Sequence, residues 1–136
     1  MTGLIALVVA LVGATIFGIL WQRRSGRVRE VSRRHEVMSA ADLGVPLGER
    51  ATLVQFSSAF CQPCRATKVI LAEVTAMVPG VVHVEIDAES RLELVRSLDI
   101  MRTPTTLFLD RDGAVRKRAS GQPRKADVIA ALGEYI

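Results

Sequence analysis

The stretch FSSAFCQPCRAT, residues 56–67, holds both cysteines of the 136-residue chain. Cys61 and Cys64 follow the pattern C-x-x-C, which occurs in redox pairs, in half of a zinc site and in short structural disulfides. A disulfide between positions this close constrains almost no loop, so it would add little stability through chain entropy. The segments on either side decide among the remaining alternatives.

The cysteines lie between a predicted strand and a predicted helix. Residues 52–57 (TLVQFS) are rich in β-branched and aromatic side chains, which is typical of a strand. A helical period follows, and Pro79-Gly80 ends it. The side chains expected to share its inward face are Ala66, Val69, Ile70, Val74 and Met77.

Further elements follow downstream. Strands are predicted over residues 81–86 and 105–109, with a helix over residues 89–98 between them. A hairpin turn at residues 110–113 requires positive φ at Gly113, and the charged returning strand 114–119 is predicted at a sheet edge. A last helix begins after Pro123. The residues expected inside are Leu92, Val95 and Leu98 in the first helix and Val128, Ile129, Leu132 and Ile136 in the last.

The element order β, α, β, α, β, β, α predicts a mixed sheet with helices on both faces, because a β–α–β unit makes a parallel pair and a hairpin an antiparallel one. Residues 39–43 form a possible short helix that Gly44 and Pro46 would stop.

The N-terminal region predicts a membrane anchor. Residues 4–20 (LIALVVALVGATIFGIL) carry no charge, and Trp21 follows at the expected membrane interface. A cleaved signal peptide is disfavoured, because no basic side chain precedes the apolar run. A buried helix of a soluble fold is disfavoured too, because no face of this helix is polar. We therefore predict an anchor at 1–21, a basic juxtamembrane linker at 22–36 and a folded domain at 37–136.

Charge predicts the orientation of this anchor. The arginines lie just after the span and place the domain in the cytoplasm by the positive-inside rule, where they also attract anionic lipid. They contribute much of the net charge of +4, and no aromatic residues are interleaved with them, so no nucleic-acid partner is predicted. These residues are Arg23, Arg24, Arg27, Arg29, Arg33 and Arg34.

The position of the cysteines favours redox chemistry. Cys61 stands at the mouth of a helix, where free N–H groups and the helix dipole lower the pKa of a thiol and favour the attacking thiolate. Cys64 lies one turn on, where its sulfur returns beside that of Cys61. The pair thus suits a two-step exchange, with Cys61 as nucleophile and Cys64 as resolving thiol. Pro63 fits the first helical turn.

Metal binding is the weaker alternative. A structural zinc site needs four ligands, and the chain offers two cysteines, His35 in the linker and His83 in a strand. Copper binding by two thiolates has no further support. No metal and no organic cofactor is predicted.

The motifs together resemble the thioredoxin family. The resemblance covers about residues 50–136 and depends on FCQPC after a strand, Arg102-Thr-Pro-Thr105 before another strand, Asp112-Gly113, and Gly121. It implies a thioredoxin-like mixed sheet, here preceded by one transmembrane helix. It also implies a first β–α unit, for which two alternatives remain: residues 28–43 supply a degenerate version, or the domain lacks it. It also implies a cis Pro104 facing the cysteines, Thr103 offering backbone hydrogen bonds to substrate, and room for substrate at Gly121.

The sequence departs from the family pattern around the motif. Phe60 replaces a tryptophan beside the nucleophile, and Gln62 replaces a glycine between the cysteines. Together with Pro63, these two residues are predicted to contact substrate. Gln55 stands where the family has a buried aspartate and cannot titrate, although it can hold a water or a hydrogen bond near Cys64. His83 stands where the family often has a lysine, and we hypothesise that it accepts the proton of Cys64. A half-exposed histidine without a role is the alternative.

The sequence therefore predicts a membrane-anchored thiol–disulfide oxidoreductase that reduces protein disulfides. Its partners would be disulfide-containing protein clients, a reductase or membrane dithiol as electron donor, and lipid around the anchor. One alternative is an exported exchange protein of the cell envelope. Another is a non-catalytic thioredoxin-fold binding or chaperone module, which the lost aspartate and tryptophan favour.

Overall fold

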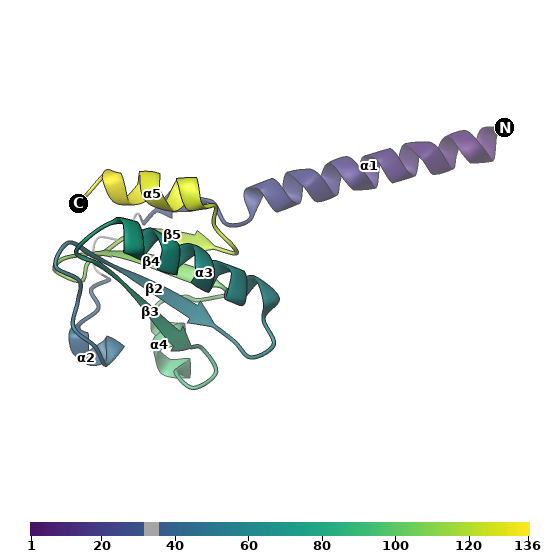
Figure 1. The fold of residues 1–136 in the computed structure, drawn as a ribbon. Helices are drawn as coiled ribbons and strands as arrows, with labels where there is room; N and C mark the ends of the chain where they lie inside the picture. The colour runs from purple at the N-terminus through teal and green to yellow at the C-terminus, as the bar shows by residue number, and fades with distance from the viewer. Residues whose placement is uncertain (32–35) are drawn as a thin grey trace.

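The computed structural model describes residues 1–31 and 36–136 (Figure 1). Residues 32–35, which include His35 and two arginines of the predicted linker, lie outside the described residues. The elements are α1 (Thr2–Arg24), β1 (Val28–Glu30), α2 (Ala40–Leu43), β2 (Ala51–Ser57), α3 (Gln62–Met77), β3 (Val81–Asp87), α4 (Leu92–Ser97), β4 (Thr105–Asp110), β5 (Val115–Ser120) and α5 (Lys125–Gly133).

Five strands form one mixed sheet in the order β1-β5-β4-β2-β3. β2 and β3 run parallel because α3 crosses between them, and the other neighbouring pairs run antiparallel. The predicted mixed sheet is confirmed, as is the positive φ of Gly113 at the hairpin turn, which is 83°.

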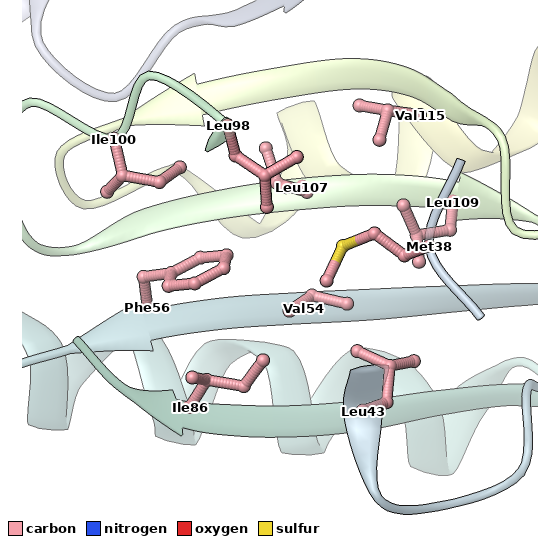
Figure 2. Close-up of a cluster of buried hydrophobic side chains, with 10 residues drawn as sticks. All are labelled: Met38, Leu43, Val54, Phe56, Ile86, Leu98, Ile100, Leu107, Leu109 and Val115. Carbon is pink, nitrogen blue, oxygen red and sulfur yellow. The ribbon is translucent and has the colours of Figure 1, made fainter. Parts of the chain in front are cut away.

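The sheet carries a core on each face. α3 and α5 cover one face, and α2 and α4 lie on the other, so the predicted two-sided cover is confirmed (Figure 1). β2 lies between the two cores and all its residues are buried. Figure 2 shows the core on the face that α2 and α4 cover, whose buried members are Met38, Leu43, Val54, Phe56, Ile86, Leu98, Ile100, Leu107, Leu109 and Val115.

The inward faces of two helices differ from those predicted. On α3, Val69 and Met77 are more than half exposed. The helical period predicted an apolar face of α3. The face that actually packs against the sheet is rotated from it and includes small polar side chains. The buried residues of α3 are Cys64, Thr67, Leu71 and Val74.

The remaining helices need smaller corrections. α4 begins at Leu92, whose side chain is exposed, and Leu94 rather than Leu92 packs with Val95 against the core. Ile129 of α5 lies at the surface, and so does Ile136, which follows the end of this helix. The inward residues of α5 are Val128, Ala131 and Leu132.

A short β–α unit precedes β2, so the degenerate version is present. α2 begins at Ser39, whose hydroxyl and backbone form a capping box with Asp42. Gly44 ends the helix in the left-handed conformation with a φ of 73°. β1 supplies the strand of the unit, although the predicted domain boundary placed it in the linker.

Because β1 pairs with β5, β5 does not lie at the edge of the sheet. Val28 pairs with Ala119 and Glu30 with Lys117, so β5 is an inner strand and its predicted edge position is wrong. The charged residues of β5 do not mark a sheet edge, because its side chains alternate between buried positions and positions that reach the surface. Lys117 is buried and pairs with Glu134, the C-cap residue of α5.

α1 stands apart from the domain (Figure 1). Its 23 residues have a mean hydropathy of 2.6 over the most apolar window, and none of them, all of which the structure describes, is buried. The helix is therefore long and apolar enough to be a candidate membrane span. The connection from α1 to β1 consists of Ser25, Gly26 and Arg27.

Gly26 holds this connection against the domain. Its N–H donates to the carbonyl of Ser120 at 2.7 Å, and its φ is 77°. A Cβ at this position would overlap the carbonyl oxygen of Gln122. The connection can follow this path only because residue 26 has no side chain.

We predict that Gly26→Ala destabilises the domain more than Gly44→Ala. Both glycines have positive φ, but a Cβ at Gly44 meets no atom within 4 Å. Gly44→Ala should lower the unfolding free energy by about 1 kcal/mol, and Gly26→Ala by about 2–4 kcal/mol, because overpacking adds to the backbone strain. Urea unfolding of residues 25–136, followed by circular dichroism, measures both. Equal losses would show that the contact with Gln122 is unimportant.

Candidate active site

The cysteine pair lies where β2 ends and α3 begins. Cys61 is the N-cap residue of α3, and its sulfur accepts a hydrogen bond from the backbone N–H of Cys64 at 3.2 Å. Pro63 lies in the first turn, where its missing N–H costs no helical hydrogen bond. The free N–H groups of this turn favour negative charge, so the local fold favours a thiolate at Cys61.

The two sulfurs are bonded and differ in exposure. Cys61 and Cys64 form a disulfide, with their Cα atoms 5.2 Å apart. Cys64 is 3% exposed, whereas Cys61 is half-buried. An external disulfide can therefore reach Cys61 before Cys64, which is the order that a nucleophile and a resolving thiol require.

Thr103 and Pro104 lie beside the pair. The peptide bond between them is cis, as the resemblance implies. The Thr103 hydroxyl is 4.0 Å from the Cys61 sulfur and 2.8 Å from the Ser58 hydroxyl. Pro104 is buried and its carbonyl accepts from the N–H of Gly121 at 2.7 Å, so β4 and β5 hold its position.

The predicted surface residues flank Cys61 in sequence and face solvent. Gln62 and Pro63 are exposed, and Phe60 is 99% exposed with a left-handed φ of 57°. Phe60 thus presents an uncovered aromatic side chain directly before the nucleophile. Its role in substrate contact stays a prediction.

The space at Gly121 is already filled. A Cβ there would overlap the guanidinium of Arg102, and it would lie 3.1 Å from the backbone nitrogen of Gly26. The glycine therefore leaves room for Arg102 and the juxtamembrane connection, rather than for open solvent. No local pattern predicts that Arg102 reaches the juxtamembrane connection, because Arg102 and its hydrogen-bond partner Ser25 are 77 positions apart.

Gln55 connects the start of α3 to the sheet. Its side chain is fully buried on β2, and its Nε2 donates to the Cys64 carbonyl and the Ser57 hydroxyl, each at 2.8 Å. A hydrogen bond near Cys64, which the sequence analysis expected of Gln55, is confirmed. The carbonyl can only accept, so the amide orientation is fixed and its oxygen faces His83.

This orientation sets the state of His83. Its Nε2 lies 3.0 Å from Gln55 Oε1, which accepts only, so Nε2 carries a proton. Burial lowers the pKa of His83 from its ordinary value of 6.5, although the Glu85 carboxylate opposes this effect and Lys68 adds to it. The neutral imidazole with its proton on Nε2 is therefore favoured at neutral pH.

The sequence analysis missed Glu85 and assigned no role to Ser57. The Ser57 hydroxyl donates to Glu85 at 3.3 Å, and Lys68 of α3 lies 3.3 Å from the other carboxylate oxygen. A period of two would have found Glu85, because residues 83 and 85 of β3 point to the same face of the sheet. A polar path thus leads from Gln55 to an exposed carboxylate.

The described residues contain no group of three or more His, Cys, Asp or Glu side chains that could hold a metal ion. Cys61 and Cys64 are joined to each other, and His83 is bonded to an amide. His35 lies outside the described residues.

Comparison with known proteins identifies the family. The sequence profile of the thioredoxin family matches residues 41–134. The chain belongs to the thioredoxin family. It is 31% identical to thioredoxin H5 of Oryza sativa subsp. japonica over 72 residues, or 53% of each chain. It is 28% identical to thioredoxin H4-1 of the same plant over 116 residues, which cover 82% of this chain and 85% of that protein.

Solved thioredoxin structures share the fold. The chain superimposes on chloroplastic thioredoxin z with a TM-score of 0.60 and 24% identity, over 77% of this chain and 96% of the other. Mitochondrial thioredoxin 3 of Saccharomyces cerevisiae, in its oxidized form, gives a TM-score of 0.56 at 16% identity, over 63% of this chain and 79% of the other. With the family and the bonded cysteines established, Cys61 and Cys64 are the redox-active pair of a thioredoxin-family thiol–disulfide oxidoreductase.

Proposed function

We propose that the chain is a membrane-anchored reductase of protein disulfides. The observation that carries this proposal is the pairing of a reachable Cys61 with a buried Cys64 at the start of α3, beside Thr103 and the cis Pro104. α1 supports the anchor, because its exposed apolar surface needs cover. The two features together favour clients at a membrane.

The reaction proceeds in two exchanges. The Cys61 thiolate attacks one sulfur of the client disulfide, forms a mixed disulfide and releases the other client sulfur as a thiolate. The Cys64 thiolate then attacks the Cys61 sulfur and releases the second client thiolate. Two electrons pass from the dithiol to the client, and Cys61 and Cys64 end as the disulfide seen here. A reductase or a membrane dithiol must return the electrons.

We predict different outcomes for the two cysteine variants. Cys61→Ser should abolish insulin reduction by the full chain with dithiothreitol, because no nucleophile remains. Cys64→Ser should accumulate a mixed disulfide with the client, because nothing resolves it. Turbidity and non-reducing electrophoresis measure these outcomes. If Cys61→Ser reduced insulin as fast as the unchanged chain, the protein would be a binding module of the thioredoxin fold instead.

The charge beside α1 supports a cytoplasmic domain. Arg23 and Arg24 end the helix, and the residues of α1 before them include no Lys or Arg. We predict that an impermeant maleimide labels reduced Cys61 only after cells are opened. Labelling of intact cells would place the domain on the exported side and favour the envelope alternative. A cysteine introduced at Thr2, the first residue of α1, should show the opposite accessibility.

His83 is proposed to accept the proton that Cys64 loses before it attacks. Gln55 lies between the two residues and cannot titrate, and His83 Nε2 already holds a proton, so Nδ1 would receive the new one. The lowered pKa of His83 keeps the imidazole neutral, and hence able to accept a proton, down to a pH below 6.5. The resolving step should therefore slow only in more acidic solution.

Two variants separate proton transfer from positioning. His83→Phe removes the donor to Gln55 and the titrating group, whereas His83→Gln restores an N–H donor without titration. We predict that both slow resolution of a Cys61 mixed disulfide about 10- to 100-fold near pH 7 and abolish the acid limb. Stopped-flow measurement over pH provides the test. Full rescue by Gln would make His83 a positioning residue, and an unchanged His83→Phe profile would exclude both roles.

A further inference from the structure

The active site and the end of α1 line one cavity of about 890 Å³. Pro63, Thr103 and Pro104 border it on the active-site side, and Ile19, Gln22 and Arg23 border it on the helix side. A client segment bound beside Cys61 would therefore lie against the last turn of α1. This arrangement is unexpected for a domain on a flexible tether.

The three residues between α1 and β1 are held to the domain by hydrogen bonds, so they do not form a flexible linker. Gly26 donates to the Ser120 carbonyl at 2.7 Å, and β1 begins two residues later. The guanidinium of Arg102 bonds the Ser25 hydroxyl at 3.0 Å and the Ser120 carbonyl at 3.3 Å. Because Arg102 directly precedes Thr103, these bonds join the juxtamembrane connection to the active-site loop.

The cavity opens where the membrane surface would lie. Trp21 and Arg23, near the end of the apolar run, are the residue types that occupy the lipid–water interface. Ile19 lies one helical turn before Arg23 and also borders the cavity. If α1 spans a membrane, the groove beside Cys61 therefore faces the headgroup layer.

The cavity is cationic. Arg23, Arg27, Arg102 and Arg124 line it, and Asp127 is the one acidic side chain among the described lining residues. Asp127 is paired with Arg124 at 2.9 Å. The remaining arginines leave a positive potential that an acidic group of a bound segment would neutralise.

We infer that the groove selects membrane-bound proteins whose disulfide lies in the headgroup layer, next to acidic residues. This inference rests on the proposed function. A membrane protein fits better than a lipid headgroup, because Pro63, Pro104 and Thr103 line the cavity, and the Thr103 hydroxyl lies 4.0 Å from the reacting sulfur of Cys61. The rigid connection limits the distance from the membrane surface at which Cys61 can meet a client disulfide. The arginines favour clients with acidic residues beside that disulfide.

The test uses the full chain in phosphatidylcholine nanodiscs with synthetic single-span peptides. Each peptide carries a cysteine in disulfide linkage to a fluorescent thiol, about three or about fifteen residues beyond its span, a difference of about 40 Å when extended. Asp-rich and Lys-rich flanks are compared, and a soluble peptide without a span reports the basal exchange rate. We expect release from the near, acidic peptide to be about tenfold faster than from the far one.

Three variants locate the cause. A flexible spacer of about ten residues between Arg24 and Ser25 should remove the preference for the near cysteine, and the soluble peptide should react as before. Arg102→Gln should reduce the preference for acidic flanks at least threefold. Arg111→Gln is the matched control, because this exposed arginine lies at the far end of β4 from Pro104. It should change neither preference.

Each outcome separates this inference from the proposed function. Failure to release thiol from every peptide would overturn both. Equal rates on near and far peptides, or a preference that survives the spacer, would overturn the inference alone. Inhibition of soluble-peptide exchange by phosphatidylserine, relieved by Arg102→Gln, would show a lipid headgroup site and would also overturn it.

Discussion

A polar side chain buried on an inner strand of the sheet holds the active site together. Gln55 lies within β2, away from solvent, so its amide must find partners inside the protein. It donates to the Cys64 carbonyl and accepts from His83, and it thereby ties the first turn of α3 to β3. The cysteine pair depends on this tie, because that turn sets the positions of both sulfurs. A neutral amide provides the connection without the cost of a buried charge.

The same sheet fixes the relation between the site and α1. β1 pairs with β5 on the side away from β3, and it starts immediately after the connection from α1. The end of β5 also leads to Gly121, where Arg102 and Gly26 meet. The chain thus brings the end of α1 to the cavity that Pro104 lines. The short strand β1, which covers a sheet edge, therefore also fixes where α1 joins the domain.

Most of the sheet could be predicted, whereas helix packing could not. Strands such as β2 and β4 are recognisable because their composition is local information. α3 was found, but its inner face was misjudged because Thr67 is buried there with its hydroxyl bonded to the Pro63 carbonyl at 2.8 Å. A satisfied hydroxyl can occupy a core position that hydrophobicity assigns to Val69. β1 is too short to give a periodic pattern.

The sequence by itself determined the cysteine pair, its place between a strand and a helix, the apolar helix α1 and the proline beside the site. Each of these follows from residue types that are close together in the chain. Only the tertiary structure decided that Gln55 faces Cys64, that His83 donates to Gln55, and that Arg102 fills the space at Gly121. These contacts join distant segments, and their geometry depends on how the sheet and helices pack, which local sequence patterns do not encode.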